Sequence, residues 1–396
     1  MSCLKINAMA LLRSRWSVDS YQRRDKRGGF ALSRCFMCGV ELTSDNKSRE
    51  HILLNAIGGK LKSDKLVCKN CNSIFGDEFD ALLAKQLQVF SVLLDVSRDD
   101  GETPPIVATR SSNGEKIMVM PGGKPSLYKP KVTFQEENGK KVFHVVARSP
   151  KELNRIYKGI KAKHPSAHTT ESGNKTENIN ELINIEFDLG GQSFLSVCKT
   201  AICYFLHVGG NQCWIQNIID RFKANDVLHF CNFCYLEKQL IQKEDDSICH
   251  TIVLVGDSKS ELLYSYIELF NFYHIIVLLN DRYDGEDISH SYCYDLIKRK
   301  EINVDICSLF SRAEIEEALS HDIGIYAPKL VKELNATKMY IENKNTVEKV
   351  FNMIFEKYKD QYPNGIPTDL FAKEFSESIV TEMRPYILKN RENDEN

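Results

Sequence analysis

The sequence predicts an α+β protein with a small cysteine-rich N-terminal unit, a larger mixed α/β domain and a helical C-terminal region. Three features of the pattern indicate this fold class. Two CxxC pairs lie close together near the N-terminus, strand-like apolar runs alternate with helical periodicity between about 100 and 310, and residues 311–385 are mainly helical in pattern. A chain of 396 residues is long enough for two or three domains.

Composition and charge exclude several classes of protein. Hydrophobic residues make up 42% of the chain and charged residues 27%, as in ordinary globular proteins. The net charge of -2 excludes a uniformly basic coat protein, so any nucleic-acid affinity must come from local patches. No apolar run reaches 18 residues, so we expect no membrane span. The 13 cysteines include two tight pairs, which favours a cytoplasmic protein with reduced thiols and one metal site over a disulfide scaffold.

The chain is expected to divide into segments that differ in charge and periodicity: a basic lead-in (1–30), a cysteine-rich unit (31–97), a β-rich segment with a helix (98–165), a mixed α+β domain (180–385) and a disordered charged tail (386–396). The basic character continues to residue 34, with eight Lys and Arg against two Asp. Two interpretations of this lead-in stay open: an arm that contacts phosphates, and a solvated leader.

Local patterns predict the elements of the first half. Apolar residues at mixed three- and four-residue spacing predict a helix over 75–94, which must end before the Gly and Pro residues of the loop SRDDGETPP. The runs KVTFQ and KVFHVVA flank Asn138-Gly139, which predicts a β-hairpin. Ser149 then serves as the cap of a helix with Pro150 at its first position and Glu152 at its third. A polar linker follows, with a domain boundary near 165–180.

Longer apolar runs mark the second half. SFLSVCKTAICYFLHVGG predicts a buried helix that is closed by Gly209 and Gly210. The runs VLHFCNFCYL, TIVLVGD and HIIVLL predict strands, because β-branched and aromatic residues are enriched in them.

The two CxxC pairs predict a structural metal site. Cys35 and Cys38 form the first pair, and Cys68 and Cys71 form the second. Each tight turn can aim two thiolates at one point, and four thiolates give zinc a closed tetrahedral shell without an open position. We therefore expect structural zinc that supplies folding energy to a segment with little core of its own.

Between and just after these pairs lies a second set of metal-binding side chains. Glu50 and His51 are adjacent, and Asn72 directly follows the second CxxC pair. If zinc brings the two halves together, Glu50 and Asn72 can hold one Mg²⁺ or Mn²⁺ through oxygen atoms, with His51 beside it. An imidazole that is neutral near pH 7 can take a proton from water, and the cation stabilises charge on a phosphodiester. This set suits phosphodiester hydrolysis.

The order of these motifs resembles the HNH endonuclease family, which has the ββα-metal fold. The resemblance rests on CxxC, then EHI with a following Gly-Gly, then LVCxxCNS with FG soon after, and it covers about residues 31–80. It implies that His51 is the general base, Glu50 a metal ligand and Asn72 the second protein ligand of the catalytic metal. The family's central Asn falls near Ser63 or Asp64, and its frequent Pro is Leu54 here.

Other candidates receive weaker interpretations. Lys60, Lys62, Lys65 and Lys69 surround the motif and are read either as phosphate contacts or as solvated lysines. A third CxxC pair, Cys231 and Cys234, precedes Cys249 and His250, but scattered cysteines in apolar strands usually belong to the core. The aromatic cluster is also read as core or as a dimer surface rather than a stacking platform for bases; it consists of Tyr264, Tyr266, Phe270, Phe272 and Tyr273.

The function predicted from these observations is a metal-dependent HNH endonuclease that hydrolyses DNA. The resemblance extends to bacterial restriction and anti-phage nucleases, in which the domain over 180–385 would set specificity or oligomerisation. A homodimer is one expected way to cut both strands. Two alternatives stay open: an inactive zinc-containing DNA-binding module, and a nuclease effector that a partner protein or small molecule activates.

Overall fold

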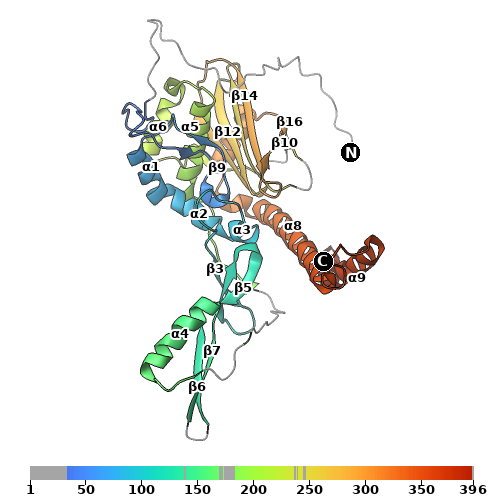
Figure 1. Ribbon diagram of the computed structural model, residues 1–396. Helices are drawn as coiled ribbons and strands as arrows, with labels where there is room; N and C mark the ends of the chain where they lie inside the picture. The colour runs from blue at the N-terminus through green and yellow to red at the C-terminus, as the bar shows by residue number, and fades with distance from the viewer. Residues whose placement is uncertain are drawn as a thin grey trace.

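The computed structural model describes residues 34–137, 140–168, 173, 183–235, 238, 240–243 and 247–394. Helices and sheets are mixed along the chain, with the cysteine cluster near the N-terminus and a helical C-terminal region, so the predicted α+β class is confirmed (Figure 1). The basic lead-in and most of the predicted linker near 165–180 lie outside the described residues.

A six-stranded antiparallel sheet forms the centre of the body, in the order β15-β14-β11-β12-β13-β9. Its strands are β9 (Cys231–Phe233), β11 (Cys249–Asp257), β12 (Leu262–Leu269), β13 (Tyr273–Asn280), β14 (Ile288–Asp295) and β15 (Lys300–Glu301). The predicted strands TIVLVGD and HIIVLL correspond to β11 and β13. The run VLHFCNFCYL contributes only the three residues of β9, because its first half turns back at residues 228–230.

Both faces of this sheet are covered, which explains why its strands read as continuous apolar runs. Successive side chains of a strand point to opposite faces. In β11, Ile252 and Leu254 therefore belong to the large core, while Val253 and Val255 belong to a second, smaller one. Helix α5 (Phe194–His207) packs on the large-core face, and α7 (Arg312–Ser320) contributes Ile315 to the smaller core. A small two-stranded sheet joins β10 (Ile241–Gln242) to β16 (Asp305–Ile306).

The cysteine-rich unit is a short hairpin followed by a run of helices. The hairpin consists of β1 (Glu50–His51) and β2 (Lys62–Ser63), with a single 3₁₀ turn at Asn55–Ile57 between them. The helical run consists of α1 (Lys69–Phe75), a π-helical turn at Gly76–Asp80, α2 (Ala81–Gln86) and α3 (Gln88–Leu93). It begins six residues earlier than the predicted helix over 75–94, because the second CxxC pair forms its first turn.

This unit does not have a core of its own. Phe75 and Phe79 pack edge-to-face against Phe222 of α6 (Gln216–Lys223), and buried residues of both segments form one hydrophobic cluster with the large-core face of the sheet. Buried His250 of β11 reinforces the contact, because its Nε2–H donates to the carbonyl of Ile57 at 2.9 Å. The segments that the sequence separates as 31–97 and 180–385 thus pack as one body.

Residues 106–163 form an extension that projects from α3 (Figure 1). Its base is a sheet in the order β5-β4-β3-β8, made of β3 (Ile106–Arg110), β4 (Lys116–Met120), β5 (Lys124–Leu127) and β8 (Ile183–Asn184). Its outer part is the predicted hairpin, β6 (Lys131–Glu137) and β7 (Lys140–Val146), with α4 (Pro150–Lys163) beside it. The predicted cap is present, because Ser149 Oγ accepts from the backbone N–H of Glu152.

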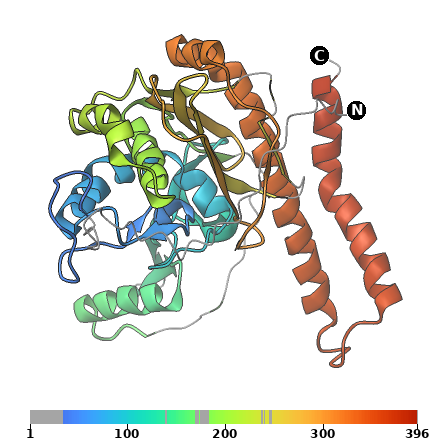
Figure 2. The same cartoon turned by 90° about the horizontal axis from the view of Figure 1, so that it is seen from above.

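Two long helices form the C-terminal region and run side by side away from the sheet (Figure 2). They are α8 (Ile323–Tyr358) and α9 (Thr368–Asp394). Helix α9 continues into the segment 386–396 for which the sequence predicts disorder, because Leu, Lys, Arg and Glu in that segment are good helix formers. Among the described helices, none combines the length and apolar composition needed to cross a membrane.

The packing decides between the interpretations of the aromatic cluster and of the third CxxC pair. The aromatic cluster of β12, β13 and their turn is core, since each of its five members is at most 4% exposed, so it cannot stack on nucleic acid. Cys231 and Cys249 are buried as well, and among the described residues the N-terminal cysteines are the only close cluster of three or more Cys, His, Asp or Glu side chains, so the third CxxC pair forms no second cluster of this kind.

Candidate active site

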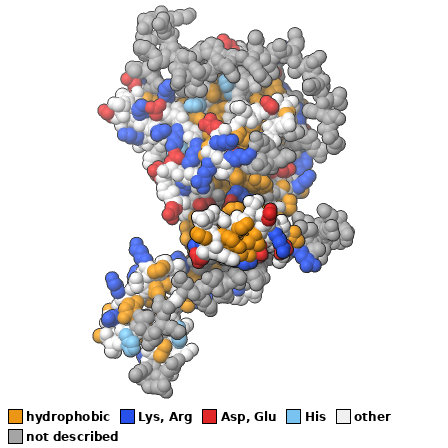
Figure 3. Space-filling view, turned by 45° about the vertical axis from the view of Figure 1, so that its right-hand side comes forward, with side chains coloured by type: hydrophobic (Ala, Val, Ile, Leu, Met, Phe, Trp, Pro, Cys, Tyr) orange, Lys and Arg blue, Asp and Glu red, His pale blue; other side chains and the backbone are white. Residues whose placement is uncertain are grey.

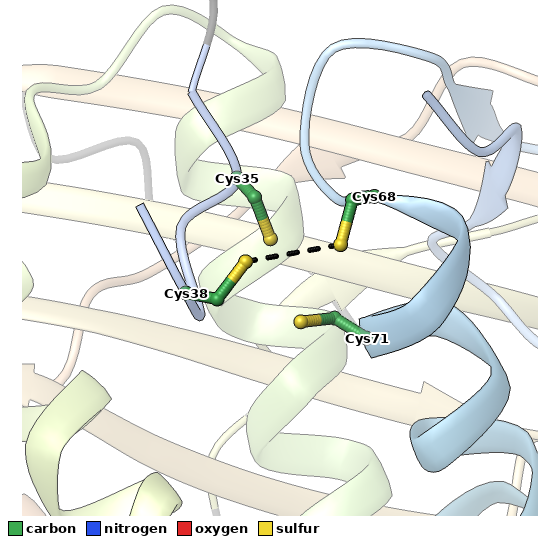
Figure 4. Close-up of side chains that lie close together, drawn as sticks. All are labelled: Cys35, Cys38, Cys68 and Cys71. Carbon is green, nitrogen blue, oxygen red and sulfur yellow. Dashed lines mark hydrogen bonds between the residues drawn. The ribbon is translucent and has the colours of Figure 1, made fainter. Parts of the chain in front are cut away.

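The four predicted cysteines converge on one point. The sulfur atoms of Cys35, Cys38, Cys68 and Cys71 all lie within 4.8 Å of one another, and Figure 4 shows them pointing inward from two chain segments. The Cys38 and Cys68 sulfurs are 3.8 Å apart. Two ligands of a tetrahedral zinc with 2.3 Å bonds lie ~3.8 Å apart. The cluster therefore has the dimensions of a closed tetrathiolate metal site.

Backbone hydrogen bonds connect the cluster to the rest of the unit. Phe36 N–H donates to the carbonyl of Leu66, and Ser48 N–H donates to the carbonyl of Val67. These bonds place the first CxxC turn and the residues before β1 beside the start of α1. The cysteine cluster and these hydrogen bonds thus hold β1, which carries Glu50 and His51, close to α1, which carries Asn72.

Glu50 lies at the base of the site and is 2% exposed. Its Oε1 accepts from the ammonium of Lys199 at 2.6 Å, and the same ammonium donates to Asp80 Oδ2 at 2.5 Å. Lys199 belongs to α5 and is fully buried, whereas Asp80 closes the π-helical turn after α1. Two carboxylates and one ammonium leave a net negative charge beside Asn72.

Burial and ion pairing compete in this group. Burial raises the pKa of the Glu50 carboxyl, and the charge of Lys199 opposes that rise. Burial alone would lower the pKa of the Lys199 ammonium, but the carboxylates of Asp80 and Glu50 raise it above its usual value. Lys199 therefore stays protonated, because a buried cation between two acids is better paired than solvated.

His51 is half-buried and is oriented by a carboxylate from outside the motif. Its Nε2 lies 3.0 Å from Asp99 Oδ2 in the loop after α3, and Lys60 and Lys62 also pair with Asp99. Burial, together with the charges of Lys62 and Lys199, lowers the pKa of His51 to about 4. The imidazole is therefore neutral at pH 7. Since a carboxylate only accepts, Nε2 carries the proton and Nδ1 carries the lone pair.

Asn72 occupies the first turn of α1 and faces the hairpin. Its Nδ2 donates to Ser48 Oγ at 2.8 Å, and no described residue donates to its Oδ1. Gly76 and Asp80 follow at four-residue intervals, so all three positions lie along one face of the helical run. The amide oxygen is consequently available as a ligand on the same face as the Asp80 carboxylate.

One cavity of about 320 Å³ joins these side chains. It is lined by Glu50, His51 and Asn72, and also by Leu54, Gly76, Asp80 and Arg98 among others. The three residues singled out from the sequence thus meet at a shared space, although they come from two elements. Carboxylate and amide oxygens are hard donors of the kind that Mg²⁺ and Mn²⁺ prefer, and the net negative charge suits a cation. The donor set fits a catalytic divalent metal.

The remaining residues named from the sequence have other partners. Ser63 pairs with Glu50 across the β1–β2 hairpin, and Asp64 forms an exposed ion pair with Lys47. Lys60 and Lys62 contact Asp99, and Lys69 Nζ donates to the carbonyl of Asp45.

Three residues of the site were missed by sequence reasoning. A lysine inside the otherwise apolar run SFLSVCKTAICYFL was a usable signal for Lys199, because an unpaired lysine is rarely buried. The helical spacing from Asn72 was a usable signal for Asp80. No local signal distinguished Asp99 from Asp100 beside it.

Comparison with known proteins agrees with this geometry. The model of the HNH endonuclease family matches residues 35–88, which include the four cysteines, the Glu-His pair, Asn72 and Asp80. Neither the curated proteins nor the solved structures provide a match. Residues 35–88 thus match the HNH endonuclease family, which points to a nuclease domain in this part of the chain.

Proposed function

We propose that this protein is a metal-dependent endonuclease that hydrolyses phosphodiester bonds of DNA. One observation carries the proposal: Glu50, His51 and Asn72 line a single cavity beside a four-thiolate cluster, within a domain that matches the HNH family. The thiolate cluster is assigned to structural zinc, because four sulfurs complete a tetrahedral shell. The oxygen donors are assigned to Mg²⁺ or Mn²⁺.

The neutral imidazole of His51 acts as the general base in this proposal. With Nε2–H donated to Asp99, Nδ1 is the atom that accepts a proton from the attacking water. Asp99, although it is not buried, holds the ring in one tautomer and orientation, as the acid does in other acid-histidine pairs. A pKa of about 4 keeps the imidazole neutral and ready to accept a proton at neutral pH.

Glu50 and Asn72 are the residues proposed to hold the catalytic metal, which supplies charge stabilisation at the scissile phosphate when bound. Lys199 favours the ionised form of the buried Glu50 carboxylate and holds one of its oxygens, Oε1, in an ion pair. Lys199 and Asp80 are therefore positioning residues. Lys60 and Lys62 are held by Asp99 beside His51, where their charges favour approach of a phosphate.

The decisive experiment is nicking of supercoiled plasmid by purified protein with Mg²⁺ or Mn²⁺, with EDTA as the metal control. His51→Ala is expected to reduce the nicking rate by ~10²–10⁴-fold, the usual contribution of a general base. DNA binding by this variant should persist. His229→Ala is the matched control, because His229 is exposed and distant in sequence from the site.

Two outcomes would count against the proposal in different ways. Equal nicking rates for wild type and His51→Ala would show that His51 is not the general base. DNA binding that needs no metal, without any nicking, would favour an inactive DNA-binding module. If a cell extract or a small molecule then switches nicking on, the protein is an effector that needs a trigger.

A role in restriction or anti-phage defence, and a homodimer that cuts both strands, are further parts of this proposal. One HNH centre cuts one strand, so double-strand cleavage needs two copies or two successive nicks. Sedimentation of the free protein and of its DNA complex measures the number of copies. Plaque counts on cells that express wild type or His51→Ala measure protection against phage, and equal counts would remove the defence role.

A further inference from the structure

The extension from the body carries most of the molecule's unbalanced positive charge. We call residues 124–163 the basic arm; it contains β5, β6, β7 and α4. It holds eleven Lys and Arg against three Glu, a net charge of +8, while the rest of the chain holds 41 basic and 51 acidic residues, a net charge of -10. A near-neutral protein is therefore strongly polarised.

Helix α4 presents part of this charge as a stripe. Lys151, Arg155, Lys158 and Lys161 are exposed and recur at three- and four-residue spacing, so they share one face of the helix. Arg155 lies 3.7 Å from Glu152, and the three lysines form no ion pair with a described carboxylate. The opposite face contains Leu153, Ile156, Tyr157 and Ile160, which are partly buried beside β7. The cations therefore point to solvent.

The basic arm has little core of its own, and it projects from the body. In Figure 3 it extends below the body, with blue Lys and Arg side chains beside orange hydrophobic ones. Phe134 in β6 is 60% exposed, and Lys141 Nζ lies 5.5 Å from the centre of its ring. A two-stranded hairpin of this kind is only marginally stable in water. Its positive charge and its exposed aromatic side chain therefore suit binding better than packing.

The base of the basic arm is fixed to the helical run that carries the site. Helix α3, which continues the helical run that carries Asn72, contacts β3 and β4, and the Leu93 side chain at its end lies against Gly123. Asn345 of α8 donates to the carbonyl of Leu93 and supports the same joint. The arm is thus attached directly to the HNH domain rather than to the far side of the body.

We propose that the basic arm binds the phosphate backbone of the nucleic acid that the HNH domain acts on, without reading its bases. The inference rests on the proposed function for its choice of a phosphodiester substrate. Unpaired lysines on one helix face suit regularly spaced phosphates, and an exposed phenylalanine beside a lysine suits contact with sugars or bases. The arm extends the bound length of duplex beyond the cavity.

The chemistry of the site favours nucleic acid over the other polyanionic partners. A basic surface with exposed apolar residues also suits an anionic membrane. The basic arm, however, is built on the helical run of a phosphodiester-cleaving family, and its apolar residues lie on a hairpin rather than along the exposed face of α4. A membrane surface is therefore an outcome of the test and not the proposal.

The test measures binding separately from cutting. Full-length protein with His51→Ala is titrated into labelled 30-base-pair DNA and RNA duplexes over a range of salt concentrations. The arm variant replaces Lys151, Arg155, Lys158 and Lys161 with Gln. The matched control replaces the exposed Lys332, Lys338, Lys349 and Lys373 of α8 and α9 with Gln, which changes the net charge by the same amount. Circular dichroism establishes that both fold.

We expect the affinity of the arm variant alone to depend less steeply on salt concentration than that of the parent. Each phosphate contact contributes ~0.9 to the slope of log affinity against log salt, so four lost contacts reduce that slope by ~3.6. Between 50 and 200 mM salt, the fall in affinity then becomes ~150-fold smaller than in the parent. Equal effects on DNA and RNA duplexes identify the shared backbone as the ligand, and an effect on one of them identifies that nucleic acid.

Contrary outcomes are distinct from failure of the nuclease proposal. An arm variant that keeps the parent slope and affinity, or that loses no more than the α8–α9 control, overturns the inference. Arm-dependent binding to vesicles with 30% phosphatidylserine, without binding to duplexes, overturns it in favour of a membrane. Arm-dependent duplex binding by a protein that never nicks DNA supports the arm and counts against the nuclease alone.

Discussion

Replacing Lys199 with methionine is expected to lower the free energy of unfolding by about 3–5 kcal/mol. Methionine keeps most of the apolar stem of the fully buried lysine but leaves two carboxylates without their cation. Asp80 retains a hydrogen bond from Ser196 at 2.6 Å and is 17% exposed, so most of the loss comes from Glu50, which is 2% exposed. Urea unfolding at pH 7, with zinc present, measures the difference.

Two companion variants separate this cause from a general packing defect. Lys47→Met breaks an ion pair whose partners are each almost half exposed, so its cost is expected to be about 0–1 kcal/mol. Adding Glu50→Gln to Lys199→Met is expected to recover part of the loss, because it removes the unpaired charge. A loss below about 1 kcal/mol for Lys199→Met, or no recovery in the double variant, would refute the argument. Because Lys199 opposes the rise in the pKa of Glu50, the single variant Lys199→Met is also expected to bind Mn²⁺ more weakly in a titration.

Three further predictions concern the scaffold. Burial lowers the pKa of His250 to about 4, so the unfolded chain takes up this proton at a higher pH than the folded chain does. The contribution of His250 to the free energy of unfolding is therefore complete above pH ~6.5 and falls by up to ~1.4 kcal/mol per pH unit toward pH 4. In urea titrations, His250→Asn should flatten this pH dependence. Cys38→Ser should abolish bound zinc and reduce helicity, as a strong chelator should in the wild type, whereas Cys213→Ser, which also replaces an exposed cysteine, should retain one zinc by elemental analysis. In thermal unfolding, Gly59→Ala should destabilise the protein by about 1–3 kcal/mol, because the new Cβ would lie 2.2 Å from the Leu53 carbonyl oxygen. Gly76→Ala should stabilise it by about 0.5–1 kcal/mol, because Gly76 has helical backbone angles and open space around its Cβ position.

The parts of the fold that sequence predicted well are governed by local rules. The pairing of β6 with β7, the Ser149 cap and the buried helix α5 depend on residues that are close together in the sequence. The convergence of the four cysteines was also accessible, because CxxC spacing is itself a metal-ligand geometry. In these cases the pattern and the structure report the same short-range constraint.

The parts that sequence did not predict depend on contacts across long separations. Lys199 reaches Glu50 over 149 positions, and Asp99 reaches His51 over 48. Nothing in the local pattern around Glu50 indicates that a different segment supplies its counter-charge. The division between 31–97 and 180–385 also followed from local patterns, because separate motifs suggest separate domains. In the structure, Phe75 and Phe222 belong to one hydrophobic core, and long-range contacts of this kind join the two segments into one body.

The support behind the cavity, finally, comes from α5 and not from the matched domain. Lys199 pairs with Glu50, and the adjacent Thr200 donates to the carbonyl of Ile52, so the segment that the family model recognises is completed by residues more than a hundred positions away. Residues 35–88 alone therefore do not contain every contact that the site needs. Grafting residues 35–88 onto another protein would leave Glu50 facing a foreign surface, and a chimaera that retains the catalytic histidine would also have to transplant α5.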